Sequence, residues 1–350
     1  MKIAQVAPLM ESVPPQGYGG TERVVSYLTE ELVRQGHDVT LFASGDSVTQ
    51  AKLEPAVDRA LRLSRNCRDP LAWHMLMLRR VAELAHTFDI VHFHIDYLHF
   101  PMSQVMREPS LTTLHGRLDL AEHQAVYNAY DDQPLISISN AQREPVPGLN
   151  WLANVYHGLP RRLYRFQAQS GGYLAFLGRI SPEKRVDRAI EIARRSGREL
   201  VIAAKVDPVD QAYFEAEIEP LLASPGVRFV GEVDDRTKAE ILGSAYALVF
   251  PIDWPEPFGL VLIEAMACGT PVIAFRRGSV PEVVDHGRSG LVVDDMDGAV
   301  AAVDAIATLD RTTCRRVFER RFSVRRMARE YLAAYRRIID VELASSRAAS

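Results

Sequence analysis

Short apolar strands alternate with helical segments along almost the whole sequence, and this pattern restarts near its middle. Residues 2–7 predict a buried strand, residues 21–35 a helix with Thr21 as its N-cap, and residues 38–43 a second strand. Strand–helix–strand units of this kind favour a parallel sheet. After a polar linker at residues 161–172 the same alternation begins again at residue 173. The chain therefore predicts an α/β fold with two doubly wound, Rossmann-like domains, residues 1–160 and 170–322, and a C-terminal helix at 323–350.

The composition is consistent with two globular domains and excludes several classes of protein. The 350 residues are 47% apolar and 25% charged, and the net charge of −4 argues against nucleic acid as a partner. Cys67, Cys268 and Cys314 are scattered, so they predict neither a disulfide framework nor a metal knuckle. The first residues predict a strand rather than a signal peptide, and no run approaches about 18 apolar residues. We therefore expect a cytoplasmic protein.

A strand that ends at Phe250 is followed by a proline-broken loop and a helix. Pro257 is predicted to be the first helical residue, because a proline loses no hydrogen bond at that position. Gly269 should end the helix in a left-handed conformation, and Pro271 prevents its continuation. The segment therefore predicts a helix whose amino terminus lies at the carboxyl end of a strand.

The amino terminus of this helix is a candidate anion site. Its first N–H groups have no partner within the helix, and such a terminus binds phosphate. Glu256 precedes the helix and Glu264 lies within it; carboxylates repel phosphate, so they suit hydroxyl groups on either side of one. A sugar nucleotide has this order of hydroxyls, diphosphate and hydroxyls, whereas the plainer interpretation is an acidic residue that favours the helix dipole. The amides concerned are those of Phe258, Gly259 and Leu260, and Gly259 also leaves room for a ligand.

A departing diphosphate must be neutralised, and two basic residues could do this without a metal. Arg179 and Lys184 lie in the loop after the first strand of the second domain. With the helix terminus they would form a cationic clamp, although a loop of this kind taken alone is more often a solvated turn. Asp295 and Asp297 form an Asp-x-Asp pair, but its position after a late strand predicts a capping cluster rather than a metal site. We therefore expect no metal and no cofactor.

The first domain contributes weaker candidates. Gly19 and Gly20 follow its first strand and place bare backbone over the crevice expected there, unless they form a mere turn. His115 follows a strand at residues 111–114 and is placed for ligand contact, unless it is satisfied locally. His92 and His94 predict a hydrogen-bonded pair at the end of a strand rather than a zinc site. Residues 46–68 predict irregular structure.

The stretch Glu256-Pro-Phe-Gly-x4-Glu264-Ala-Met-Ala-Cys-Gly-Thr-Pro resembles the Glu-x7-Glu signature of the retaining glycosyltransferases of family 4. The resemblance covers essentially the whole chain and implies the GT-B fold, with two domains facing a deep cleft and a last helix that crosses back to the first domain. The start Val13-Pro-Pro-Gln-Gly-Tyr-Gly-Gly is also similar to that of antibiotic-tailoring members of the avilamycin type. The implied activity is metal-independent transfer of a hexose from a UDP-sugar, or else a GDP-sugar, to an acceptor hydroxyl.

The resemblance also implies roles for single residues in the second domain. Glu256 would hold hydroxyls of the donor hexose, and Glu264 would bind the ribose hydroxyls. Arg179 and Lys184 would bind the diphosphate. The remaining contacts would come from backbone: the amides of Phe258, Gly259 and Leu260 on the β-phosphate, and the edge from Gly231 to Val233 on the base.

In the first domain, which would bind the acceptor, Gly19 and Gly20 resemble the loop that closes over the diphosphate. His115 resembles the histidine that contacts sugar and acceptor. The sequence departs from many relatives at Val155-Tyr-His-Gly-Leu-Pro160, where an Asn-Gly-Val pattern is common.

Other functions stay open at this point. A nucleotide-sugar 2-epimerase of the same fold would need no acceptor, and a non-catalytic sugar-nucleotide-binding protein would use the same donor site. The arginine-rich C-terminal helix admits weak association with a membrane surface, although its interleaved acidic residues favour an ordinary solvated face. The sequence identifies neither the acceptor nor the oligomeric state.

Overall fold

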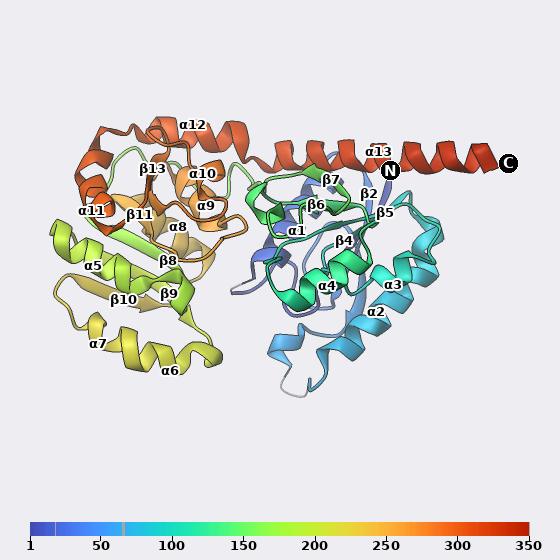
Figure 1. Cartoon of the computed structure of the whole chain (residues 1–350), viewed down its shortest axis with the longest axis horizontal. Coiled ribbons are helices and arrows are strands. Elements are labelled where there is room, and N and C mark those ends of the chain that lie inside the picture. Colours follow the sequence, from blue (N-terminus) through green and yellow to red (C-terminus); the bar gives the residue numbers. More distant parts are fainter. Residues whose placement is uncertain (18, 65–66, 350) are drawn as a thin grey trace. The chain divides into compact units, whose positions relative to one another are not determined.

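The computed structural model describes residues 1–17, 19–64 and 67–349, which form two compact units (Figure 1). Unit 1 comprises Met1–Gly158 and Val324–Ser350, and unit 2 comprises Leu159–Ser323. The chain therefore leaves unit 1, builds unit 2 without interruption, and returns to unit 1 for its last helix. Residue 18 of the glycine loop and residues 65 and 66 lie outside the described residues.

The described part of unit 1 contains a seven-stranded parallel sheet in the order β3-β2-β1-β4-β5-β6-β7. Its strands are β1 (Lys2–Val6), β2 (Asp38–Ser44), β3 (Lys52–Val57), β4 (Ile90–Phe93), β5 (Ser110–Thr113), β6 (Leu135–Ser137) and β7 (Trp151–Asn154). Its helices are α1 (Gly20–Arg34), α2 (Pro70–Leu84), α3 (Phe100–Ser103), α4 (Ala121–Ala129) and α13 (Val324–Ala349). The strand order reverses between β1 and β4, and ligands of such sheets bind where the strands end beside this point.

The central strands of unit 1 are buried on both faces, as expected of parallel strands covered by helices. Ile3, Ala4 and Val6 of β1 have no exposed surface. Gln5 is equally buried but polar, so its amide must find partners inside the unit.

Two predictions for unit 1 are wrong in detail. Residues 46–68 contain an edge strand, β3, which was missed because it includes Pro55 and is only partly buried; proline is tolerated in a strand that has a partner on one side alone. Helix α1 begins at Gly20, with Gly19 rather than Thr21 as its N-cap, and the Gly19 carbonyl accepts the amide of Arg23 at 3.3 Å.

The described part of unit 2 contains a six-stranded parallel sheet in the order β10-β9-β8-β11-β12-β13. Its strands are β8 (Leu174–Ile180), β9 (Leu200–Val206), β10 (Val227–Gly231), β11 (Ala247–Phe250), β12 (Val272–Phe275) and β13 (Gly290–Val293). Its helices are α5 (Val186–Ser196), α6 (Gln211–Tyr213), α7 (Glu219–Leu222), α8 (Asp235–Ser244), α9 (Leu260–Cys268), α10 (Val280–Val283), α11 (Met296–Ala305) and α12 (Arg311–Arg321). Here the order reverses between β8 and β11.

Helix α9 follows β11 as predicted and ends at Gly269, which has φ 87° and donates its N–H to Met266 at 2.9 Å. Its beginning is a correction: the helix starts at Leu260 and not at Pro257. Gly259, with φ 79°, turns the chain sharply just before the first helical residue, so the two residues ahead of it lie outside the helix.

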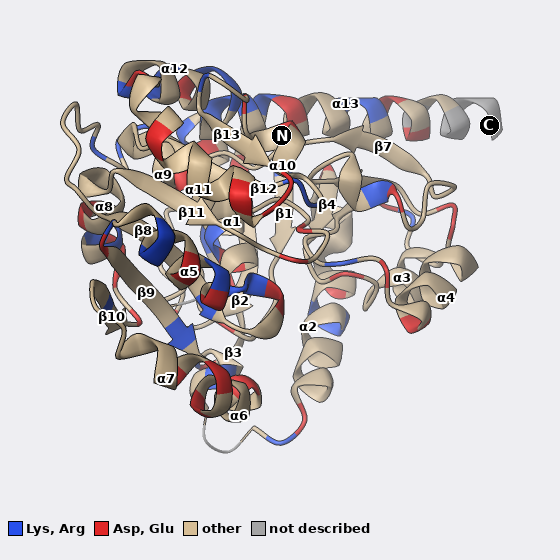
Figure 2. Ribbon diagram, turned by 60° about the vertical axis from the view of Figure 1, so that its left-hand side comes forward, with Lys and Arg blue, Asp and Glu red and all other residues tan. Residues whose placement is uncertain are grey.

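The last helix, α13, packs on α1 within unit 1. Tyr331 and Tyr335 on its inner face are fully buried. Acidic residues are interspersed with its arginines (Figure 2), and Arg326 pairs with Glu330 one turn later. In the part of the chain that the structure describes, none of the helices is both long and apolar enough to cross a lipid bilayer.

Candidate active site

Three loops of unit 2 leave the carboxyl ends of β8, β11 and β12, next to the reversal in strand order. Backbone hydrogen bonds join them into one surface: the amide of Asp253 donates to the carbonyl of Glu183 at 2.9 Å, and the amide of Ser279 donates to that of Glu256 at 2.9 Å. The loops are therefore fixed to each other as well as to their strands.

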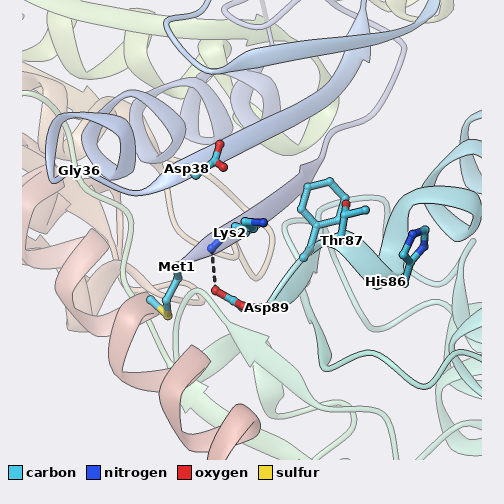
Figure 3. Close-up of a pocket in the computed structure, with 8 residues that line it drawn as sticks. Met1, Lys2, Gly36, Asp38, His86, Thr87 and Asp89 are labelled. Carbon is cyan, nitrogen blue, oxygen red and sulfur yellow. Dashed lines mark hydrogen bonds between the residues drawn. The ribbon is translucent and has the colours of Figure 1, made fainter.

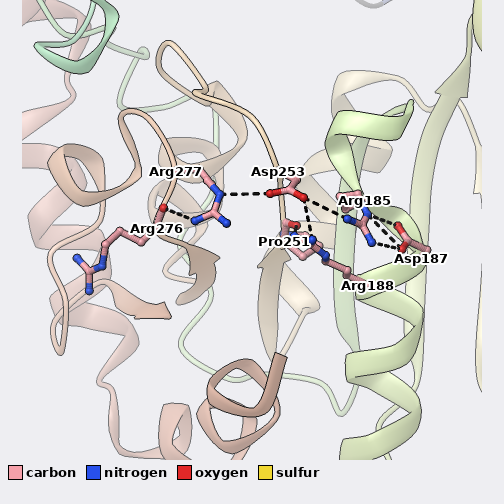
Figure 4. Close-up of polar contacts among 7 residues, drawn as sticks. All are labelled: Arg185, Asp187, Arg188, Pro251, Asp253, Arg276 and Arg277. Carbon is pink, nitrogen blue, oxygen red and sulfur yellow. Dashed lines mark hydrogen bonds and ion pairs between the residues drawn. The ribbon is translucent and has the colours of Figure 1, made fainter. Parts of the chain in front are cut away.

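Asp253 connects the same loops through its side chain (Figure 4). It accepts from Arg188 at 2.8 Å, from Arg185 at 3.2 Å and from Arg277 at 3.3 Å. Burial raises the pKa of Asp253, but the charges and hydrogen bonds of Arg188 and Arg277 lower this pKa by more. The net shift is therefore downward. One carboxylate thus holds together arginines from the β8 and β12 sides of the surface.

Glu256 lies in the loop after β11 and is paired with Lys184, whose side chain donates to Oε2 of Glu256. The indole N–H of Trp254 donates to the same oxygen at 3.0 Å, and the Lys184 ammonium lies 4.8 Å from the centre of the Trp254 ring. The Glu256 side chain is only 12% exposed. A buried carboxylate of this kind needs a cationic partner, and Lys184 supplies it.

Gly278 lets the β12 loop pass directly against the backbone of Glu256. A Cβ atom built on Gly278, whose φ is +49°, would lie 2.5 Å from both the nitrogen and the carbonyl oxygen of Glu256. A side chain at position 278 would therefore displace Glu256.

The amino terminus of α9 begins immediately beyond this loop. Leu260 opens the helix, and the amide of Leu262 is turned back to the carbonyl of Gly259 at 3.0 Å. Phe258 is buried and packs edge-on against Phe322, with ring centroids 6.1 Å apart. The amides of Phe258 and Gly259 therefore come from the turn ahead of the helix, and that of Leu260 from its first residue.

Glu264 is buried inside α9 and has two partners that the sequence did not suggest. Tyr164 donates its hydroxyl to Oε1 of Glu264 at 2.8 Å, and Lys238 donates its ammonium to the same oxygen at 2.8 Å. Glu256 and Glu264 are thus each paired with one lysine.

The guanidinium group of Arg179 lies among acidic side chains. It pairs with Glu183 at 2.7 Å and lies 3.6 Å from Asp207 and 3.8 Å from Asp210. Burial raises the pKa of Asp210 more than the Arg179 charge lowers it. The structure therefore places Lys184 against Glu256 and Arg179 in an acidic cluster, so the predicted joint clamp on a diphosphate requires that both exchange partners when a ligand binds.

The predicted base-reading edge lies at the end of β10. Gly231 is the last residue of that strand, with φ 73°, and Val233 follows in the loop that leads to α8. Asp295, by contrast, caps α11 by accepting the amide of Gly298 at 2.8 Å, and Asp297 pairs with Arg195 at 2.7 Å. The capping prediction is thus confirmed for Asp295, whereas Asp297 forms an ion pair instead.

In unit 1, His115 follows β5 and is held by a second histidine. Its Nε2 lies 2.8 Å from Nδ1 of His94, and its ring stacks on that of His157 with centroids 5.3 Å apart. Burial lowers the pKa of His115 to about 3, so the ring is neutral at physiological pH. The prediction of a hydrogen-bonded His92 and His94 is confirmed, since each ring has two polar partners.

A hollow in unit 1 lies at the opposite edge of its sheet, where strands begin (Figure 3). It is lined by Met1, Lys2, Asp38 and Asp89, among others, and the amide of Lys2 donates to Asp89 at 2.7 Å. None of the predicted site residues lines it, and parallel sheets bind ligands at the other edge.

Sequence reasoning missed five residues that shape the unit 2 surface. Lys238 and Tyr164 were missed because their hydrogen bonds to Glu264 join distant segments, and Trp254 because its ring contacts the distant Lys184. Asp253 and Gly278 could have been noticed, because both lie within a few residues of a strand end beside the reversal of strand order. The roles assigned to the predicted site residues stay predictions.

Two family models match adjoining parts of the chain. The model for glycosyl transferases group 1 matches residues 166–318, and the model for Glycosyltransferase Family 4 matches residues 18–175. The sequence is similar to glycogen synthase of Mycobacterium tuberculosis, with 26% identity over 84% of this chain and 83% of that protein. It is also similar to phosphatidyl-myo-inositol mannosyltransferase of Mycolicibacterium smegmatis, with 28% identity over 89% and 86%.

Solved structures show the same fold. AviGT4, a glycosyltransferase involved in avilamycin A biosynthesis, has a TM-score of 0.76 at 24% identity and covers 97% of this chain and 98% of its own. Anabaena Alr3699/HepE, in complex with UDP-glucose, has a TM-score of 0.71 at 18% identity over 99% and 100%. The two glycosyltransferase models together match residues 18–318, so the chain is a glycosyltransferase, and it has the GT-B fold.

Proposed function

We propose that this enzyme transfers a hexose from a UDP-sugar to an acceptor hydroxyl with retention of configuration and without a metal ion. The observation that carries the proposal is the Lys184–Glu256 pair beside the amino terminus of α9, at the reversal point of the unit 2 sheet. It brings a cation, a carboxylate and the backbone amides at the start of α9 to one strand edge. A diphosphate suits the first and last of these, and sugar hydroxyls suit the second.

The donor would be held by unit 2 along the carboxyl ends of its strands. The amides of Phe258, Gly259 and Leu260 would receive the β-phosphate, with Lys184 and Arg179 neutralising its charge. Glu256 would bind hydroxyls of the hexose and Glu264 those of the ribose, and the backbone from Gly231 to Val233 would contact the base. UDP is favoured over GDP because a solved structure of the same fold is a complex with UDP-glucose.

In the reaction, the bond between the anomeric carbon and the diphosphate oxygen breaks, and a bond from that carbon to the acceptor oxygen forms. The acceptor enters on the face that the diphosphate leaves, which retains the configuration, and the departing phosphate oxygen takes the acceptor's proton. His115 and the Gly19–Gly20 loop of unit 1 would contact the sugar and the diphosphate. Metal independence is supported by the Asp-x-Asp pair, whose two carboxylates are engaged as a helix cap and an ion pair.

The test combines calorimetry with a UDP-release assay. Glu256→Gln should abolish UDP release from UDP-glucose in the presence of a panel of hydroxyl acceptors, while leaving UDP binding largely intact. Lys184→Ala with Arg179→Ala should weaken UDP binding strongly, because two cations are lost from the diphosphate. Arg195→Ala, which breaks the exposed pair with Asp297, serves as the matched control.

Each outcome has a clear meaning. Unchanged UDP affinity in the double variant would contradict the cationic clamp, and full activity of Glu256→Gln would contradict its role. Formation of an epimer from UDP-glucose alone would indicate an epimerase instead. Binding of UDP-glucose without UDP release for any acceptor would indicate a non-catalytic binding protein. Activity that persists in EDTA supports metal independence, whereas loss restored by Mg²⁺ contradicts it.

A further inference from the structure

A chain of polar side chains runs through the buried interior of unit 1 and begins at Gln5 in the middle of β1. The side chain of Gln5 donates from Nε2 to the hydroxyl of Tyr335 at 3.0 Å. Its Oε1 lies 2.8 Å from Nε2 of His94. Gln5 has no exposed surface, and His94 and Tyr335 are also buried, so water cannot replace these partners.

This arrangement decides which nitrogen of His94 carries a proton. An amide oxygen can only accept, so Nε2 of His94 must donate to Gln5. Burial, followed by the neighbouring His92, His115 and His157, lowers the pKa of His94 well below its usual value. His94 is therefore neutral with its one proton on Nε2, and its Nδ1 is an acceptor.

The tautomer of His94 in turn determines the tautomer of His115. Because Nδ1 of His94 accepts, Nε2 of His115 at 2.8 Å must be the donor. His115 is neutral as well, so its Nδ1 carries a lone pair and no proton. Among the residues that the structure describes, this buried Nδ1 has no hydrogen-bond partner. A buried polar atom without a partner costs about 1–3 kcal/mol, which calls for a functional reason.

We infer that Gln5 and His94 are positioning residues, which hold His115 in the Nε2–H tautomer so that its Nδ1 accepts a hydrogen bond from a hydroxyl of the transferred hexose. The assignment of the hydroxyl rests on the proposed function; the tautomer does not. A hydroxyl would bind the bare nitrogen, whereas the opposite tautomer would present an N–H and favour an acceptor such as a phosphate oxygen.

A second branch of the network provides an internal control. The hydroxyl of Tyr335 lies 2.7 Å from Nδ1 of His92, and Nε2 of His92 lies 2.8 Å from Oγ1 of Thr113. Thr113 in turn donates to Tyr331 at 3.1 Å. This branch starts from Nε2 of Gln5, whereas the branch to His115 starts from Oε1. Its hydrogen bonds do not include His115. Breaking it removes buried hydrogen bonds without changing the partners of His115.

The experiment reads the tautomer directly by NMR of the full-length protein with ¹⁵N-labelled histidine. His115 signals are assigned by their loss in a His115→Asn variant. We expect His115 with a protonated Nε2 and a bare Nδ1. The inference is overturned if Nδ1 carries the proton, which is the pattern that results if the Gln5 amide is turned by 180°.

Variants test whether His94 causes this tautomer. His94→Leu should convert the His115 signals to those of exchanging tautomers, because the acceptor for Nε2–H is gone. His94→Asn should restore the single tautomer, since its Oδ1 replaces Nδ1 of the imidazole. Thr113→Val should leave the His115 signals unchanged. An unchanged His115 in His94→Leu, or an equal effect of Thr113→Val, would overturn the inference.

Calorimetry with UDP and UDP-glucose then tests the hydroxyl. His94→Leu should lower the affinity for UDP-glucose about 3- to 10-fold more than that for UDP, the amount that one neutral hydrogen bond contributes. An equal change for both ligands would contradict the assignment to the hexose. If the wild-type protein binds neither ligand, the proposed donor is wrong, and the NMR result still decides the tautomer.

Discussion

At the scale of single residues, the two glutamates of the proposed donor site have similar surroundings. Glu256 is paired with Lys184, and Glu264 with Lys238, and the side chains of both glutamates are almost fully buried. A carboxylate in such a position stays charged only if a cation or several donors compensate it. Each lysine therefore supplies the counter-charge that a buried carboxylate requires.

Lys238→Met should destabilise unit 2 and weaken nucleotide binding. It leaves the buried Glu264 carboxylate with the Tyr164 hydroxyl but without its lysine, and breaking a buried pair in this way costs about 3 kcal/mol. Urea denaturation measures the loss of unfolding free energy. Arg236→Met in the same helix, where the side chain is 88% exposed, should have little effect.

The double variant Lys238→Met with Glu264→Gln separates charge from packing. Because the amide is neutral, its stability should recover most of the loss, while its affinity for UDP should stay low if Glu264 binds the ribose. A double variant as unstable as Lys238→Met would show that the loss arises from packing of the lysine stem instead.

Glu22, in the first turn of α1 after the glycine loop, predicts a pH-dependent stability. Burial raises its pKa from 4.5 to about 6, and nearby Glu11 adds to this. A raised pKa means that the native state prefers the protonated form; its stabilising contribution is full below pH 4.5 and is lost as the pH rises through 6. Glu22→Gln mimics the protonated form, so it should be more stable than wild type by up to about 2 kcal/mol at pH 7.5 and equal to it at pH 4.5.

Urea denaturation of wild type and variant at both pH values measures this difference. Glu122→Gln removes an exposed acidic residue from the first turn of α4 and controls for the loss of a favourable helix-dipole interaction. A Glu22→Gln variant that is less stable than wild type at pH 7.5 would show that the buried carboxylate is needed as a charge.

At the scale of elements, the proposed donor surface is formed by several loops rather than by one motif. The loops after β8, β11 and β12 are joined by two backbone hydrogen bonds and by the arginines around Asp253 (Figure 4). Their geometry therefore depends on close approach between loops, above all at Gly278.

Gly278→Ala should reduce activity far more than stability. Its Cβ would overlap the backbone of Glu256, and a displacement of about 1 Å of a positioned group can cost roughly 100-fold in rate. Gly287→Ala is the matched control: its φ of +77° imposes similar backbone strain, but its Cβ would meet no atom within 4 Å. UDP release and melting temperature are measured for both. Equal activity of the two variants would show that strain alone, and not the position of Glu256, matters.

The elements also show how far sequence reasoning reaches. The alternation of strands and helices predicted both sheets, because parallel strands need crossover helices and are covered on both faces. It also placed Lys184 and Glu256 at strand ends beside the reversal point. It did not predict that they pair, because they are 72 residues apart, nor that Lys238 reaches Glu264. The start of α9 was predicted three residues early because a favourable proline was weighed above the left-handed turn of Gly259.

At the scale of the whole molecule, one unit is built from a single stretch of the chain and the other from two separate stretches. Unit 2 is formed by one uninterrupted stretch, whereas unit 1 needs both ends of the chain. Tyr331 and Tyr335 of α13 complete the buried network around His92, so the last helix is part of the core of unit 1. Donor binding, as proposed, would use residues of the continuous unit for the nucleotide.

Hydrogen exchange with UDP as the ligand tests this division. At about 100 times the Kd, segments that must open to release UDP should exchange roughly 100-fold more slowly, since binding adds about 2.7 kcal/mol to their opening free energy. We expect this protection at residues 181–185 and 251–264 of unit 2, and no change in β2 of unit 1. Lys184→Ala with the same total UDP should show reduced protection, because its affinity is lower. Protection confined to unit 1, or spread evenly over both sheets, would contradict the assignment of the nucleotide to unit 2.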